Sequence, residues 1–287
     1  MVKRLLLDAD IILYEVSFAA EAYWKYLHAE RGEEVICPPP WEVVVEQLET
    51  RIQEIVNESG AEGEPILFFT GKNNFRENIA TTFVYKAHRP PKPFHYNNIK
   101  VYLKSRFKYF EEDGLEADDL LGIFLTAHPD KYICASRDKD LKQIPGWHYG
   151  WEVNKQPAFG PALVDEIGHI ELSSGKSRKI KGVGAKFLYC QMLMGDRVDT
   201  IPGIDKLGDV KAFNIINPHN TINDMENAVL EAYNKAYGDE GEERMVETGR
   251  MVYLTRWRRG DHIKLYSPHW RPTTMYDLRT REIIVDS

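Results

Sequence analysis

Short apolar runs alternate with helical patterns along the first half of the chain. Residues 4–7, 65–69 and 131–135 have the length and composition of buried strands. Between them, residues 41–56 and 117–127 carry apolar side chains at helical spacing. Strands that alternate with helices imply a mainly parallel sheet covered by helices on both faces. We therefore predict an α/β fold for this part of the chain.

Carboxylates occur in four separate places, most of them just after a predicted strand or at the start of a predicted helix. Ligands of parallel α/β sheets bind beyond the carboxyl ends of the strands, so these side chains are expected to meet there. Converging acids repel one another unless a cation holds them, and Mg²⁺ prefers oxygen ligands. The pattern predicts a metal-dependent phosphodiesterase, although helix capping or a solvated surface is the ordinary explanation of any single pair. The four groups are Asp8 with Asp10, Glu116 with Asp118 and Asp119, Asp138 with Asp140, and Asp196 with Asp199.

Composition places few limits on the class of protein. The 287 residues are 43% hydrophobic and 28% charged, as in a globular protein of one large or two modest domains. The sequence holds no apolar run near the roughly 20 residues of a membrane span, and we expect no membrane association. The apolar stretch at the start of the sequence is too short for a signal peptide. Cys37, Cys134 and Cys190 follow no metal-ligand spacing, so a reduced, cytoplasmic protein is expected.

The net charge of −7 argues against a nucleic-acid ligand, but the distribution of charge favours one. Residues 172–195 contain five basic residues and no acid, and residues 72–108 contain nine basic residues against Glu77 alone. Such blocks attract phosphate even on an acidic protein, although a solvated loop is the ordinary alternative. The nine are Lys72, Arg76, Lys86, Arg89, Lys92, Lys100, Lys104, Arg106 and Lys108.

The pattern changes beyond residue 145. Residues 147–153 and 158–164 are typical of two short strands, arranged as a hairpin. Further helical patterns lie at residues 185–194, 224–237 and 242–257. We therefore predict a boundary between an α/β domain of residues 1–172 and a helical region of residues 173–287.

Motifs in the same order and spacing resemble those of the 5′-nuclease family, which includes flap endonucleases and the 5′-exonuclease domain of bacterial DNA polymerases. Residues 114–121 (Gly-Leu-Glu-Ala-Asp-Asp-Leu-Leu), 136–141 (Ser-Arg-Asp-Lys-Asp-Leu) and 194–203 (Met-Gly-Asp-Arg-Val-Asp-Thr-Ile-Pro-Gly) carry most of the resemblance. The stretch from Phe75-Arg76 through Tyr85-Lys86 to Arg89 adds to it. The resemblance covers roughly residues 4–215 and is strongest to phage 5′→3′ exonucleases.

The resemblance implies a PIN-like nuclease fold whose site holds two divalent ions, Mg²⁺ or Mn²⁺. Lys86 and Arg89 match the basic residues that meet the scissile phosphate, and Asp119 and Asp199 match acids that act partly through water. One ion then activates a water and the other stabilises the leaving oxygen. By motif match, Asp8, Glu116 and Asp118 hold one ion, and Asp138, Asp140 and Asp196 hold or orient the other.

The resemblance also implies surfaces for DNA. Residues 202–212 match a helix–hairpin–helix, which grips the duplex backbone and often holds a monovalent cation such as K⁺. Residues 72–108 match the basic arch beside the active site. The implied partner is double-stranded DNA with a 5′ end or flap, or an RNA/DNA hybrid. The residues predicted to contact DNA are Lys72, Arg76, Tyr85, Lys86, Arg89, Lys92, Gly203, Lys206, Gly208 and Lys211.

Some positions depart from the family pattern. Thr70 stands where an Asp usually follows the second strand, which predicts weaker or water-mediated binding of one ion. Lys206 replaces the first glycine of the hairpin, which weakens the case for the K⁺ site. The arch is short, which fits trimming of duplex 5′ ends better than threading of long flaps. Asp10 has no counterpart, so we expect a supporting or surface role.

The expected function is a metal-dependent 5′→3′ exonuclease on double-stranded DNA that releases 5′-phosphorylated nucleotides. Flap cleavage or RNA-primer removal in phage-type DNA replication or degradation would accompany it. Two alternatives stay open: a single-strand ribonuclease on the same fold, and a duplex-binding module without catalysis.

Overall fold

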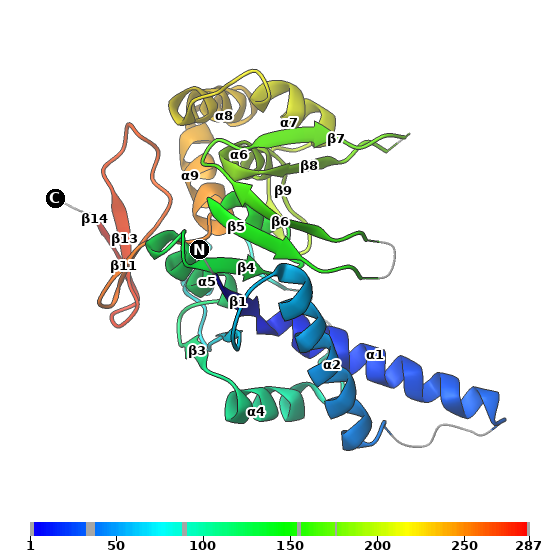
Figure 1. The fold of residues 1–287 in the computed structure, drawn as a ribbon. Coiled ribbons are helices and arrows are strands. Elements are labelled where there is room, and N and C mark those ends of the chain that lie inside the picture. Colours follow the sequence, from blue (N-terminus) through cyan, green and yellow to red (C-terminus); the bar gives the residue numbers. More distant parts are fainter. Residues whose placement is uncertain (1–2, 33–37, 88–90, 154–155, 176, 286–287) are drawn as a thin grey trace.

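A six-stranded sheet forms the centre of the computed structural model, which describes residues 3–32, 38–87, 91–153, 156–175 and 177–285 (Figure 1). The strand order is β3-β2-β1-β4-β5-β6, parallel throughout except for β6, which runs antiparallel to β5. The predicted α/β fold, with a mainly parallel sheet and a β5–β6 hairpin, is therefore confirmed. The strands are β1 (Arg4–Asp8), β2 (Ile66–Thr70), β3 (Tyr109–Glu112), β4 (Tyr132–Ala135), β5 (Gly146–Gly150) and β6 (Phe159–Val164).

The order of the strands determines where on the sheet a ligand-binding crevice is expected. β1 pairs with β2 on one side and with β4 on the other, so the chain crosses over in opposite directions from the central strand. This arrangement is the switch point of an open parallel sheet, where a crevice forms beyond the carboxyl ends. Asp8 ends β1 and Thr70 ends β2, so both side chains lie at that crevice.

Side chains of the central strands alternate between two cores, as the period of two in a strand requires. Leu5 and Leu7 pack under α1 (Ala9–Glu30), α2 (Trp41–Ser59) and α4 (Tyr96–Arg106). Leu6 points to the other face, toward α5 (Ala117–Ala127) and the C-terminal half. The predicted helices at residues 41–56 and 117–127 are confirmed, whereas α1, α4 and β3 are not evident from the sequence.

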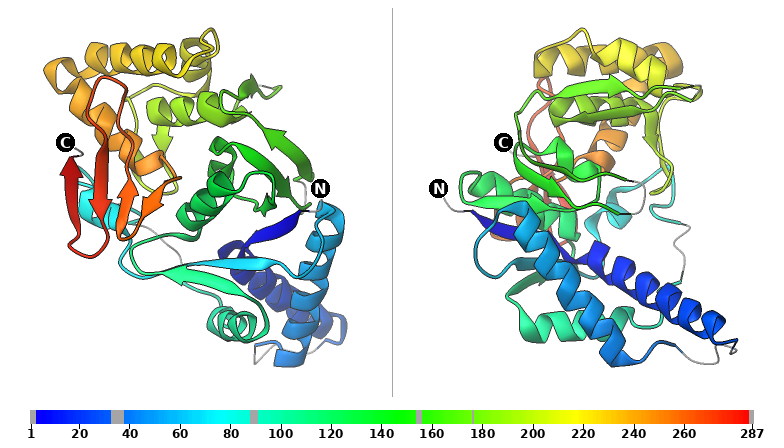
Figure 2. Two further views of the ribbon diagram at one scale, coloured as in Figure 1. Left: turned by 60° about the vertical axis from the view of Figure 1, so that its left-hand side comes forward. Right: turned by 45° about the vertical axis from the view of Figure 1, so that its right-hand side comes forward.

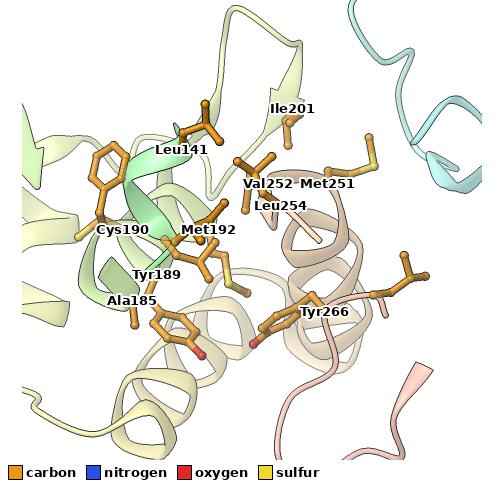
Figure 3. Close-up of a cluster of buried hydrophobic side chains, with 14 of the residues drawn as sticks. Leu141, Ala185, Tyr189, Cys190, Met192, Ile201, Met251, Val252, Leu254 and Tyr266 are labelled. Carbon is orange, nitrogen blue, oxygen red and sulfur yellow. The ribbon is translucent and has the colours of Figure 1, made fainter. Parts of the chain in front are cut away.

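The C-terminal half packs on the α5 side of the sheet, and its helices meet in one cluster with residues after β4 (Figure 3). The predicted boundary falls within the β7–β8 hairpin, and the division into two regions stays a prediction. The elements are α3 (Phe75–Ile79), η1 (Asp140–Gln143), β7 (His169–Leu172), β8 (Ile180–Val183), α6 (Gly184–Met194), β9 (Gly195–Asp196), β10 (Ile201–Pro202), α7 (Asp209–Ile216), α8 (Ile222–Tyr237), η2 (Gly238–Glu240) and α9 (Gly241–Val252).

The last part of the chain differs from the helical prediction. The helix expected to reach residue 257 ends at Val252, and a four-stranded antiparallel sheet follows it, beside α9 and α3 (Figure 2). Its strands are β11 (Arg258–Arg259), β12 (His262–Lys264), β13 (Thr274–Asp277) and β14 (Glu282–Val285). Within the described ranges, none of the helices combines the length and the apolar character needed to cross a membrane.

Candidate active site

A cleft of about 690 Å³ opens at the carboxyl ends of β1, β2 and β4. Acidic side chains from four distant segments line it, as the strand-end positions predict. Asp119 is the one predicted metal ligand that is not part of the lining. The predicted acids that meet in the cleft are Asp8, Glu116, Asp118, Asp138, Asp140, Asp196 and Asp199.

Ser136 connects the acids of β1 to those that follow β4. Its hydroxyl donates to Asp8 Oδ2 at 2.7 Å and accepts the backbone N–H of Asp138 at 2.9 Å. Asp8 also caps α1 by accepting the N–H of Ile11 at 3.4 Å, and Asp138 Oδ1 accepts the N–H of Asp140 at 2.8 Å. These bonds fix the carboxylates of two neighbouring strand ends relative to each other.

The start of α5 brings in the next group. Glu116 is the N-cap residue and forms a capping box with Asp119, so the helix dipole tolerates the negative charge there. The hydroxyl of Thr70 accepts the N–H of Ala117 at 3.0 Å. Thr70 therefore ties the end of β2 to the helix that carries Glu116 and Asp118.

The structure corrects the predicted roles of Arg76 and Asp119. Arg76 is only 1% exposed, and its guanidinium donates to both oxygens of Asp119 at 2.7 and 2.8 Å. Asp119 has no exposed surface and also accepts the N–H of Thr255 at 3.2 Å. The prediction that Arg76 contacts DNA is wrong because its side chain is enclosed, and Asp119 braces α5 instead of facing the cleft.

Two lysines neutralise part of the acidic group. Lys86 Nζ contacts Glu116 Oε1 and lies 3.5 Å from Asp199 Oδ2. Lys139, which sequence reasoning did not single out, donates to Asp196 Oδ2 at 2.8 Å. Its position between Asp138 and Asp140 in the sequence could have indicated that it belongs to the site. The cleft thus brings ammonium groups and carboxylates together at hydrogen-bond distance.

Burial and mutual repulsion raise the pKa of three other acids in the cleft. The pKa of Asp8 rises to about 7, because of burial and of the nearby Asp10 and Asp138. Burial and the neighbouring Asp138 raise the pKa of Asp140 to about 8. Burial and Asp138 raise the pKa of Asp118 as well.

The pKa of Glu116 shows the opposite balance. Burial would raise it, but Lys86 and Arg76 hold it at about 2. The cleft therefore holds carboxylates whose negative charge is balanced by a nearby cation, and carboxylates whose negative charge is unfavourable. The second kind is the electrostatic setting that a bound cation relieves.

Asp10 joins this group, although its position in the sequence predicted a supporting or surface role. It lines the cleft beside the end of β2, where its Oδ2 accepts the N–H of Thr70 at 3.2 Å. Its Oδ1 is buried and has no hydrogen-bond partner among the described residues. A carboxylate oxygen is therefore present next to Thr70, supplied by α1 instead of β2.

The donors in the cleft suit a hard divalent cation, because they are oxygen atoms with excess negative charge. Within the described part of the chain, no three His, Cys, Asp or Glu side chains stand as a ready-made metal-ligand group. Lys86 and Lys139 hold two of the predicted ligands. The assignment of individual ligands stays a prediction.

Comparison with known proteins gives relatives of one kind. No protein-family model matches the chain. It is 25% identical to a 5′-3′ exonuclease of Buchnera aphidicola over 244 residues, 78% of this chain and 73% of that protein. It is 26% identical to DNA polymerase I of Streptococcus pneumoniae over 171 residues, 55% of this chain and only 18% of the polymerase.

Solved structures share the fold. A mutant of the phage T5 5′-exonuclease matches 88% of this chain and 89% of its own, with a TM-score of 0.54 at 15% identity. A phage T5 flap endonuclease in a complex with DNA and metal ions matches over the same shares, with a TM-score of 0.55 at 16% identity. The T5 5′-exonuclease with bound zinc gives the same score. The chain therefore shares its fold with these 5′-nucleases and is similar in sequence to a 5′-3′ exonuclease. The resemblance drawn from the carboxylate motifs is confirmed.

The basic residues predicted to contact DNA differ in their exposure and in their position around the cleft. Lys72 and Lys92 line it and are exposed, as a phosphate contact requires. Tyr85 is 8% exposed, and its hydroxyl donates to Glu116 Oε2 at 2.8 Å, so it shapes the cleft floor. Arg89 lies outside the described residues. The expected exposed surface of the 72–108 region is only partial, because α4 packs into the core through Ile99 and Leu103.

The segment predicted to form a helix–hairpin–helix, residues 202–212, follows α6 and extends into α7. Gly203 packs so closely on the backbone of Met194 that an added Cβ would approach its carbonyl carbon to 2.2 Å. Lys206 adopts a positive φ of 57°, a conformation that favours glycine. Lys211 Nζ donates to the carbonyl of Lys206 at 3.1 Å, and Gly208 caps α7 in open space. Contacts of these residues with DNA and K⁺ stay predictions.

Proposed function

We propose that this protein is a divalent-metal-dependent 5′→3′ exonuclease on double-stranded DNA that releases 5′-phosphorylated nucleotides. Cleavage of 5′ flaps or RNA primers accompanies that activity, in DNA replication or degradation of the phage type. The observation that carries the proposal is the meeting of seven motif carboxylates with Lys86 in one cleft. The exonuclease from Buchnera and the T5 enzymes with DNA and metal ions support it.

The residues have distinct parts in this proposal. Asp8, Glu116, Asp118, Asp138, Asp140 and Asp196 would hold two Mg²⁺ or Mn²⁺ ions. When bound, the ions supply an activated water and stabilise the charge on the leaving oxygen. Lys86 would meet the scissile phosphate, because it can exchange Glu116 and Asp199 for phosphate oxygens. Arg89, outside the described residues, would assist it.

The surroundings of the cleft suit a nucleic-acid substrate. Lys72 and Lys92 would hold the phosphates that flank the cleaved bond. The hairpin of Gly203, Lys206, Gly208 and Lys211 would hold the duplex backbone further along, with or without K⁺. Backbone contacts position DNA without reading its sequence, so cleavage would not depend on sequence.

A product time course tests the function. An end-labelled blunt duplex and a matched 5′-flap duplex are incubated with Mg²⁺, with Mn²⁺ and with EDTA. Metal-dependent release of 5′-mononucleotides from the duplex supports the exonuclease, and release of whole flaps shifts the proposal to an endonuclease. Cleavage of single-stranded RNA alone would favour the ribonuclease alternative.

Variants separate catalysis from binding. Asp138→Ala should abolish cleavage and retain duplex binding in a gel-shift assay, because Asp138 lies among the acids and not among the basic contacts. Asp239→Ala, at an exposed position in η2, is the matched control and should cleave normally. Normal turnover by Asp138→Ala would contradict the site. Binding by the wild type without cleavage under any metal would favour a non-catalytic module.

A further inference from the structure

One face of α1 leads outward from the cleft. Asp10 and Tyr14 line the cleft, and Phe18 continues the same i, i+4 row. With a rise of 1.5 Å per residue, Phe18 lies about 12 Å from Asp10 along the helix axis. Figure 2 shows α1 extending well beyond the sheet with α2 alongside. A ligand that leaves the cleft along α1 therefore meets this row of side chains.

Aromatic rings from α1 and from the segment that leads into α4 lie along this row. The ring of Tyr14 lies 6.3 Å from the ring of Phe18, at an interplanar angle of 23°, and 4.9 Å from the ring of Tyr96 at the start of α4. The N–H of Phe94 donates to Glu21 on α1 at 3.2 Å, which places Phe94 next to the outer part of the same helix. We call Tyr14, Phe18, Phe94 and Tyr96 the aromatic wall.

The two outer members of the aromatic wall are unusually exposed for phenylalanine. Phe18 is 51% exposed and Phe94 is 65% exposed, whereas Tyr96 is buried. The inner rings thus support the wall, and the outer rings present their surfaces to solvent. Grouped exposed aromatic side chains that adjoin a cleft are typical of a binding surface.

Positive charge accompanies the rings. Lys92 Nζ lies 4.3 Å from the centroid of Tyr96, and both residues line the cleft together with Lys72. Glu21, an acid on the outer part of α1, accepts the N–H of Phe94. Aromatic faces next to lysines are the combination that binds single-stranded nucleic acid, because bases stack on rings while ammonium groups hold phosphates. An acidic or purely apolar partner would use only half of this surface.

We infer that the aromatic wall binds unpaired nucleotides of the strand whose 5′ end is processed, with bases stacked on Phe18 and Phe94 and a phosphate at Lys92. This inference rests on the proposed function, since the continuity of wall and cleft identifies the strand. Stacking does not depend on base identity, so the wall is tolerant of sequence. It gives this nuclease a preference for 5′ overhangs or flaps over blunt ends.

The test compares single-stranded and blunt double-stranded DNA. Affinities of a labelled 12-nucleotide oligothymidine and of a blunt duplex are measured by fluorescence anisotropy in EDTA and in Ca²⁺. Phe18→Ala/Phe94→Ala should weaken single-strand binding about 10- to 100-fold, as expected for the loss of one or two stacked bases. Duplex binding should change by no more than about twofold, since the duplex backbone is held by charge and not by stacking. Phe18→Trp/Phe94→Trp should retain single-strand affinity, because indole rings also stack.

Tyr23→Ala is the matched control, an exposed aromatic residue five positions beyond Phe18 and therefore on a different face of α1. It should bind both ligands as the wild type does. Unchanged single-strand affinity in the double alanine variant, or equal losses for both ligands, overturns the inference. Binding without cleavage in Mg²⁺ would count against the proposed nuclease and not against the wall, because the anisotropy readout needs no turnover.

Discussion

Replacing Arg76 with methionine should destabilise the protein strongly. The guanidinium donates to Asp119 twice, to Glu116 at 3.3 Å, and to the carbonyls of Met251 and Tyr253 at 3.0 and 2.9 Å. The substitution leaves the carboxylate of Asp119 buried without its cation. Removing one partner of a buried ion pair costs about 3–5 kcal/mol. The carbonyls that lose their donor add to that cost.

Urea unfolding followed by circular dichroism measures this effect. In thermal unfolding of a chain of this size, about 3–5 kcal/mol corresponds to a fall in the melting temperature of roughly 5–8 °C. Arg76→Met/Asp119→Leu should recover part of the loss, because a buried pair can be replaced by apolar side chains at little cost. Arg244→Met, which removes an exposed pair with Glu240, is the control and should have little effect.

The opposite result would refute the reasoning. If Arg76→Met unfolded at the wild-type urea concentration and bound duplex DNA more weakly, Arg76 would be a DNA contact after all. The enclosed ion pair would then not describe the protein in solution. A loss of stability with normal DNA affinity in the folded protein would agree with the structure.

Other predictions concern the cleft. In EDTA, the urea concentration at the unfolding midpoint should fall as the pH rises from about 5.5 to about 8.5. The raised pKa values of Asp8 and Asp140 mean that the folded state binds more protons than the unfolded state in that range. Mn²⁺ at the higher pH should restore the midpoint, and a midpoint that does not change with pH would contradict the repulsion between these acids. Lys86→Ala should lower the single-turnover cleavage rate about 100-fold or more and DNA affinity by less than about fivefold. Equal losses in rate and affinity would mean that Lys86 is only a general phosphate contact. Asp10→Asn should weaken Mn²⁺ binding about 10-fold in calorimetry. Adding Thr70→Asp should recover the affinity, since it returns a carboxylate to the same part of the cleft. Unchanged affinity in Asp10→Asn would mean that Asp10 only anchors β2.

The sequence was sufficient to predict the acidic cleft, because each acid has a local cue. Asp8 and Asp138 follow apolar runs at strand ends, and Glu116 begins a helix with a clear apolar face. A parallel sheet brings such positions together whatever the length of the intervening chain. The meeting of these segments therefore follows from short-range patterns.

Other features depend on contacts that no local pattern reveals. Arg76 lies in a basic stretch that looks like a surface, yet its partners come from α5 and from residues near 251, far along the chain. α1 was missed because Phe18 and Tyr26 are exposed, which blurs its apolar periodicity. The C-terminal sheet was missed because its strands are two to four residues long, too short to show alternation. Asp10 was undervalued because its proximity to Thr70 arises only when β1 and β2 pair.

The hydrogen bonds from Arg76 to the carbonyls of Met251 and Tyr253 have a consequence for protein engineering. Gln143, next to the aspartates after β4, makes a similar link, with its amide donating to Val252 O and its carbonyl accepting the N–H of Leu254. The segment that follows α9 is thus a structural support for both carboxylate-bearing regions. A minimal catalytic fragment cut at residue 172 would lose this support, and modular reuse of the α/β part in a fusion protein would have to carry residues 251–255 with it.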